Sequence, residues 1–299
     1  MEILMTWLDV PFRSGMSSKS DLRGAIEAGV PVGVVAGLLT TSAMVMVIPR
    51  YLDRGGKVFV DSGAFGAFLS GEEMDWREIM SRYQTLANMT DRPENLYVVA
   101  PDKVGDQAGT MEVLEAWATK VRALIDEGCQ VIVPIQAGDL PGQEMIERAA
   151  ALHGTRKFIV GVPSNRAAMS IEECRTLRHA AFHILGRVHA DEEQIERIYA
   201  LRDGNPFAQI NADANWLRSR MDTIRKGTEA ERERRSAAAL ARALPPVQVD
   251  HPRVDAIRRA LEADQNWGAE PAPGGMSNSN WRWRPSRPLA QPDGVALLS

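Results

Sequence analysis

Residues 57–68 read KVFVDSGAFGAF, and this stretch decides the fold class. A run of apolar and β-branched side chains leads into Asp61, after which the chain continues with the small residues Ser62, Gly63 and Ala64. Short apolar runs of this kind are typical of buried strands in a parallel sheet, and the glycine predicts a turn into a helix. Asp61 has two interpretations: its carboxylate caps that helix, or the strand presents it for chemistry at its carboxyl end.

The same strand-then-helix alternation occurs eight times along the chain. Residues 74–89 and 110–128 are examples of the intervening stretches, which have helical periodicity, and the second ends at Gly128, a natural helix C-cap. The predicted strands are residues 3–8, 31–36, 57–61, 96–100, 130–135, 157–162, 182–188 and 207–211. Eight such units predict an α/β protein with a closed (β/α)8 TIM barrel, with an open doubly wound sheet as the alternative.

Composition places the chain among ordinary soluble globular proteins. It has 299 residues, of which 44% are hydrophobic and 25% charged, with a formal net charge of −4. No apolar run approaches the roughly 18 residues that a membrane helix needs, and the first residues do not resemble a signal peptide. Two cysteines, Cys129 and Cys174, are too few for a disulfide framework. We therefore expect a cytoplasmic protein without membrane association, and the net charge argues against a uniformly basic nucleic-acid binder.

The pattern changes after about residue 215. We expect the barrel to occupy residues 1–225 and a helical extension to occupy residues 226–266, with charged helices near 222–244 and 251–264. Residues 267–299 are rich in Pro, Gly, Ser and Asn, which predicts a disordered tail. Its WRWRPSR segment has the composition to stack on bases, or it is simply part of that tail.

Polar residues and glycines lie at the carboxyl ends of five of the predicted strands. They are Asp61, Ser62 and Gly63 after the third strand, Asp102 and Asp106 after the fourth, Gln136 after the fifth, Gly161 and Asn165 in and after the sixth, and Asp213 after the eighth. In a barrel the carboxyl ends of the strands meet at one mouth, so we expect these residues to converge there. Each acid alone also suits a helix cap, and Asp106 fits that role as well as a site role. His183, in the seventh strand, fits a structural role better than a catalytic one.

Several of these segments resemble the queuine and archaeosine tRNA-guanine transglycosylases, which are (β/α)8 enzymes. DSGAF at 61–65 is similar to their DSGGF signature, and VPIQAG at 133–138 is similar to the segment whose glutamine reads the base. FIVGVPSN at 158–165 occupies the place of a glycine-rich segment, and INADANWLRSR at 210–220 resembles the segment with the nucleophilic aspartate. The resemblance covers about residues 55–225.

Two departures bear on the substrate. The chain has no counterpart of the CxCxxC zinc module of the tRNA enzymes, and Gly66 replaces the glutamine that usually follows the signature. APDKVGD at 100–106 looks more like the superfamily branch that inserts 7-deazaguanine bases into DNA, which is encoded in phages and genomic islands. The resemblance therefore implies a DNA-guanine transglycosylase. A tRNA enzyme without the zinc module, a non-catalytic barrel subunit and a different barrel enzyme remain alternatives.

The resemblance also implies roles for the residues. Asp213 would attack C1′ of the sugar and Asp61 would act as general acid and base, while Asp102 and Gln136 would bind the purine edge with backbone N–H groups near Gly161. The remaining candidates are Ser62, Gly63, Asp106 and Asn165 in the base pocket, and Arg218 and Arg220 on flanking phosphates. No cofactor and no metal are expected. The expected partners are DNA, or else tRNA, and a 7-deazaguanine base similar to preQ0, and the sequence is compatible with a homodimer.

Overall fold

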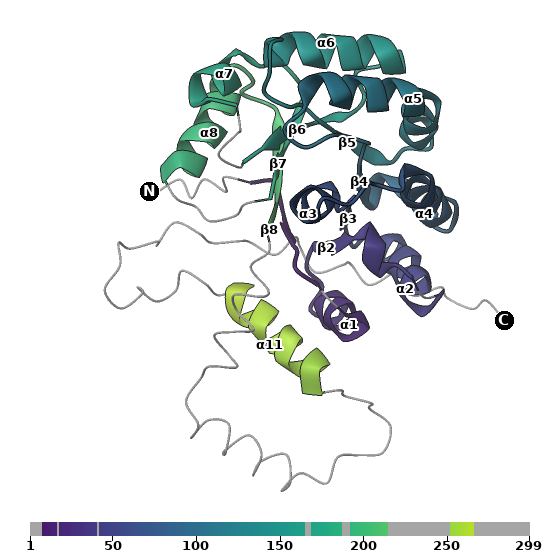
Figure 1. The fold of residues 1–299 in the computed structure, drawn as a ribbon. Coiled ribbons are helices and arrows are strands. Elements are labelled where there is room, and N and C mark those ends of the chain that lie inside the picture. Colours follow the sequence, from purple (N-terminus) through teal and green to yellow (C-terminus); the bar gives the residue numbers. More distant parts are fainter. Residues whose placement is uncertain are drawn as a thin grey trace, which may run out of the picture.

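The eight strands form one closed barrel, in which each strand pairs in parallel with its neighbours in chain order and β8 pairs with β1 (Figure 1). The computed structural model describes residues 8–16, 18–40, 42–164, 169–186, 192–214 and 252–265. The strands are β1 (Val10–Arg13), β2 (Val32–Val35), β3 (Val58–Asp61), β4 (Leu96–Val99), β5 (Gln130–Pro134), β6 (Ile159–Pro163), β7 (Ala181–Leu185) and β8 (Gln209–Ala214). The predicted TIM barrel is confirmed, and the open sheet is excluded.

Helices surround the barrel and connect its strands (Figure 1). They are α1 (Lys19–Glu27), α2 (Ser42–Asp53), α3 (Ala64–Ser70), α4 (Trp76–Asn88), α5 (Gln107–Asp126), α6 (Gly142–His153), α7 (Ile171–Thr176), α8 (Glu192–Asp203) and α11 (Pro252–Gln265), with 3-10 turns η1 (Ala36–Leu38) and η2 (Pro93–Asn95). None of the helices within the described ranges is long and apolar enough to cross a membrane.

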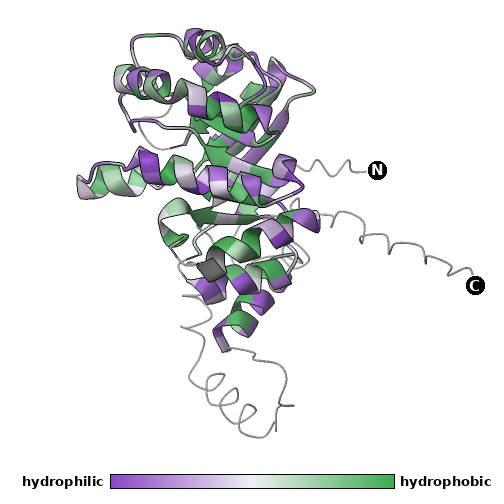
Figure 2. Cartoon of the chain, turned by 90° about the vertical axis from the view of Figure 1, so that its right-hand side faces the viewer, coloured by the Kyte–Doolittle hydropathy of each residue, from purple (hydrophilic) through white to green (hydrophobic). Residues whose placement is uncertain are grey.

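Alternation along each strand separates two hydrophobic cores. In β3, Val58 and Val60 point outward into the large core between the sheet and the helices, whereas Phe59 points into the barrel. Inside, the ring of Phe12 lies 4.8 Å from that of Tyr97 and 5.6 Å from that of Phe59. Figure 2 shows the strands as mostly hydrophobic, with hydrophilic residues concentrated on the helices. The described part of the barrel interior is thus filled by side chains, as is usual for a TIM barrel.

Helix α11 packs against α1, although more than 200 residues separate the two in sequence (Figure 1). Ile257 is fully buried at this contact, and a Cβ added to Gly24 of α1 would lie 2.9 Å from it. Arg253 also forms an ion pair with Asp21, which is 1% exposed. The helix predicted near 251–264 is therefore confirmed. The predicted helix at 222–244 and the tail at 267–299 lie outside the described residues.

The first strand differs from the prediction. We expected it at 3–8, but β1 is Val10–Arg13, and residues 1–7 lie outside the described part. The segment VPFR contains proline and ends in arginine, so it looks less like a strand than the apolar run before it. Pairing with β8 explains why the strand forms at Val10–Arg13. In this register Val10 and Phe12 enter the barrel opposite Asn211 and Asp213 of β8.

Candidate functional site

A pocket of about 830 Å³ opens at the carboxyl ends of the strands. The residues expected there from the sequence that do line it are Asp61, Ser62, Asp102, Gln136 and Asp213. They come from β3, β4, β5 and β8 or from the turns that directly follow these strands. The structure thus brings three carboxyl groups, from distant parts of the chain, to one mouth.

The turn after β3 bears on the two interpretations of Asp61, a helix cap or a residue of the site. Gly63 adopts a φ of 86°, which favours glycine, and its N–H donates to Asp61 Oδ1 at 3.3 Å. Helix α3 then begins without a side-chain cap. Asp61 lies in the same alternation as Phe59, so its carboxyl group faces the pocket. Burial and the nearby charge of Asp213 raise the pKa of Asp61 to about 6.

Asp102 follows β4 and is almost completely buried. Gln136 Nε2 donates to its Oδ2 at 3.0 Å, which favours the charged form. Burial and the charge of Asp61 act more strongly in the opposite direction and raise the pKa of Asp102 to about 7. This carboxyl group therefore exchanges a proton near neutral pH, as acid–base groups in enzyme sites do.

Asp213 is held in place through one of its two oxygens. Its Oδ1 accepts a hydrogen bond of 2.9 Å from Gly186 N–H, and His183 Nε2 lies 3.4 Å from the same atom. The ring of His183 is fully buried and stacks on Phe59 with centroids 4.8 Å apart. Among the described residues, the hydrogen bonds to Asp213 all fall on Oδ1, and the residue lines the pocket.

His183 therefore contacts Asp213, a residue of the site. The sequence did not predict this contact. The segment AFHIL alternates, with Phe182 and Ile184 in the outer core and Leu185 against the inner one. That alternation places His183 on the inner face, one step below the mouth. A polar residue on the inner face of a barrel strand was the signal that could have identified it.

Two other expected residues do not reach the pocket. Asp106 caps α5, where its Oδ1 accepts a hydrogen bond of 2.8 Å from Gly109 N–H, and its side chain is half exposed. Gly161 lies deeper in β6, where an added Cβ would come within 2.9 Å of Ile132. Its lack of a side chain thus serves packing inside the barrel. Gly63 shapes the turn beside the pocket, and Asn165, Arg218 and Arg220 lie outside the described residues.

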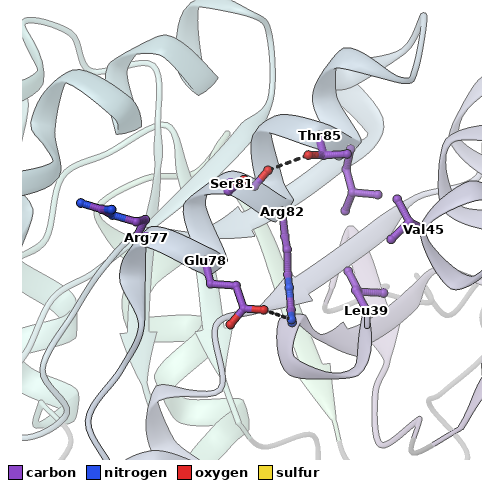
Figure 3. Close-up of a pocket in the computed structure, with 8 residues that line it drawn as sticks. Leu39, Val45, Arg77, Glu78, Ser81, Arg82 and Thr85 are labelled. Atoms are coloured by element: carbon purple, nitrogen blue, oxygen red, sulfur yellow. Dashed lines mark hydrogen bonds and ion pairs between the residues drawn. The ribbon is translucent and has the colours of Figure 1, made fainter. Parts of the chain in front are cut away.

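A smaller hollow of about 380 Å³ lies on the outer wall between α2 and α4 (Figure 3). Several of its polar groups are bonded within the wall: Arg82 pairs with Glu78 and also donates to the Ala36 carbonyl, and Thr85 Oγ1 donates to the Ser81 carbonyl. The described ranges contain no group of three or more His, Cys, Asp or Glu residues that could hold a metal ion. The pocket at the barrel mouth is therefore the candidate site.

Comparison with known proteins gives no family assignment. No family model matches the chain, and no curated protein matches it. Similar solved structures include a "xylose isomerase-like TIM barrel/4-hydroxyphenylpyruvate dioxygenase fusion protein", with 8% identity and a TM-score of 0.43 over 87% of this chain and 43% of that one. Another, "Native KDPGal structure", has 14% identity and a TM-score of 0.42 over 85% of this chain and 95% of that one. The chain thus spans less than half of the first structure, and the barrel assignment rests on strand order.

Proposed function

We propose that the protein is a base-exchange transglycosylase that replaces guanine in DNA with a 7-deazaguanine base. The observation that carries the proposal is the pairing of two unlike carboxyl groups at one pocket. Asp213 is fixed through Oδ1, while the pKa of Asp61 is raised to about 6. This division between a nucleophile and a proton carrier is the one that retaining glycosyl transfer requires.

The exchange proceeds in two displacements at C1′ of the sugar. Asp213 Oδ2 attacks C1′ as the bond to guanine breaks, and protonated Asp61 gives its proton to a nitrogen of the departing base. The enzyme then holds the sugar as an ester of Asp213. Asp61, now a carboxylate, takes the proton from the incoming base, whose nitrogen attacks C1′ and releases Asp213. No proton or electron is left over, so the reaction needs no cofactor.

The pocket is compatible with a purine base. Its volume of about 830 Å³ lies within the usual range of small-ligand sites, about 300–1,000 Å³. Asp102 supplies a buried carboxyl group to the base edge, and Ser62 also lines the pocket. A base inside a duplex cannot reach such a pocket, so the target is single-stranded or flipped out, at a cost of about a few kcal/mol.

An exchange assay tests the proposal and distinguishes DNA from tRNA. Labelled guanine is incubated with the protein and with single-stranded DNA, duplex DNA or tRNA, and label in the polymer is counted. We expect incorporation into DNA, and a loss of about 10²–10⁴-fold in Asp61→Asn. Asp106→Asn, which changes an exposed carboxylate in the next loop, should retain full activity. Incorporation only into tRNA would favour the alternative enzyme, and no incorporation into any polymer would contradict the proposal.

A further inference from the structure

Both ends of the Gln136 amide are already bonded within the protein. Its Nε2 donates to Asp102 Oδ2 at 3.0 Å, and its Oε1 accepts from Gly105 N–H at 3.1 Å. Exchanging the amide oxygen and nitrogen would place two donors against each other at Gly105, so the orientation is determined by its partners. Gln136 is also only 5% exposed. One of its two N–H donors and one of the two acceptor sites on its oxygen are therefore already used within the protein.

Gln107, at the start of α5, holds the loop that contains Gln136. Its Nε2 donates to the Gln136 carbonyl at 2.8 Å and to the Leu140 carbonyl at 2.9 Å, and its Oε1 accepts from Leu140 N–H at 2.8 Å. The close approach requires Gly138, because an added Cβ there would lie 2.7 Å from Gln107 Cβ. The loop after β5 and the loop after β4 thus form one hydrogen-bonded unit around Asp102.

We propose that Gln136, supported by Gln107, is a positioning residue that orients Asp102 and determines which of its oxygens carries the proton. Because Oδ2 accepts the amide N–H, the proton of neutral Asp102 sits on Oδ1, and the Asp102 side chain lines the pocket. There it donates to the C6 carbonyl oxygen, which guanine and 7-deazaguanine share. The base-binding part of this inference rests on the proposed function, whereas the control of Asp102 by Gln136 does not.

Within the part of the chain that the structure describes, the titratable groups that act on Asp102 are few enough to interpret its titration. Asp61 acts on it from β3, and Tyr83 of α4 lies within electrostatic range of both acids. Lys103 and Asp106 face each other at 3.7 Å in the exposed loop. None of these groups is altered when the Gln136 amide is removed, so a shifted titration would report the lost hydrogen bond.

Carbon-13 NMR of aspartate-labelled protein measures that titration directly. The Asp102 carboxyl signal is assigned by its absence in Asp102→Asn, and Gln136→Met removes the amide at nearly constant volume. We expect the midpoint to rise by about one to two pH units, because a hydrogen bond to the charged form is lost. Gln84→Met, on the outer side of α4, is the matched control and should leave the midpoint unchanged. If Gln136→Met does not fold, Gln107→Met is used instead. The midpoint of the Asp102 titration should rise in that variant as well. An unchanged midpoint in a folded variant overturns the proposal.

A double-mutant cycle on guanine affinity separates positioning from base reading. The cycle combines Gln136→Met with Asp102→Asn. If Gln136 acts through Asp102, guanine should bind no more weakly to this double variant than to Asp102→Asn alone. Additive losses would mean that Gln136 contacts the base itself, and would overturn the positioning role. If the unaltered protein binds neither guanine nor 7-deazaguanine, the proposed function fails, while the NMR titration still decides the relation between the two residues.

Discussion

Replacing Asp102 by asparagine should stabilise the folded protein, and increasingly so as the pH rises. The folded state raises the pKa of this carboxyl group from 3.8 to about 7. Between these values the folded protein binds a proton that the unfolded chain has lost, so stability falls as the pH rises through this window. Asparagine avoids the loss, and its carbonyl oxygen can still accept the hydrogen bond from Gln136.

The size of the effect follows from the two pKa values. At 1.36 kcal/mol per pH unit, Asp102→Asn should gain about 2 kcal/mol over the unaltered protein at pH 5 and about 4 kcal/mol at pH 8. Part of the gain comes from Asp61, because the mutual repulsion of the two carboxylates disappears. Such stabilisation on removing an active-site acid is typical of groups kept for function.

Urea denaturation at pH 5 and pH 8 measures both differences. Asp106→Asn is the control, because asparagine also caps helices and the site is exposed, so its stability change should be small at both pH values. If Asp102→Asn does not raise the free energy of unfolding, or if the increase is no larger at pH 8 than at pH 5, the fold does not hold this carboxyl group neutral.

Three further predictions concern other parts of the molecule. His183→Phe keeps the stacking on Phe59 but removes the contact to Asp213, so base exchange should slow by about 3- to 10-fold with little change in melting temperature. Gly24→Ala should lower stability by about 1–3 kcal/mol in urea denaturation, because the added methyl group meets α11; an increase would contradict that packing. Burial lowers the pKa of His153, so the unaltered protein loses stability as the pH falls. His153→Leu should therefore gain stability relative to it between pH 7 and pH 5. A stability difference that does not change with pH would contradict the lowered pKa.

Much of the barrel could be predicted because its strands are buried on both faces. Continuous apolar runs such as LYVV of β4 and QVIVP of β5 then stand out from the helical periodicity around them. The strand β1 was placed wrongly because its four residues contain proline and arginine, and its position is determined by pairing with β8, about 200 residues later. Pairing at that distance leaves no local signal.

The site was predictable as far as it depends on strand ends. Asp61, Asp102 and Asp213 each follow or end an apolar run, and in a barrel this position alone brings them together. The raised pKa values of Asp61 and Asp102 could not be read from the local sequence, because each depends on burial and on charges contributed by other strands. Gln107 was missed for a similar reason. Its partners lie in the loop after the next strand, about 30 residues away.

The most direct test of the account is to trap the covalent intermediate. The protein is incubated with a guanine-containing single-stranded oligonucleotide without an incoming base, and adducts are resolved on a denaturing gel. We predict an adduct for the unaltered protein and for Asp106→Asn, and none for Asp213→Asn, since an amide is a poor nucleophile towards C1′. An adduct that persists in Asp213→Asn would show that another residue attacks the sugar and would contradict the assignment of Asp213 as the nucleophile.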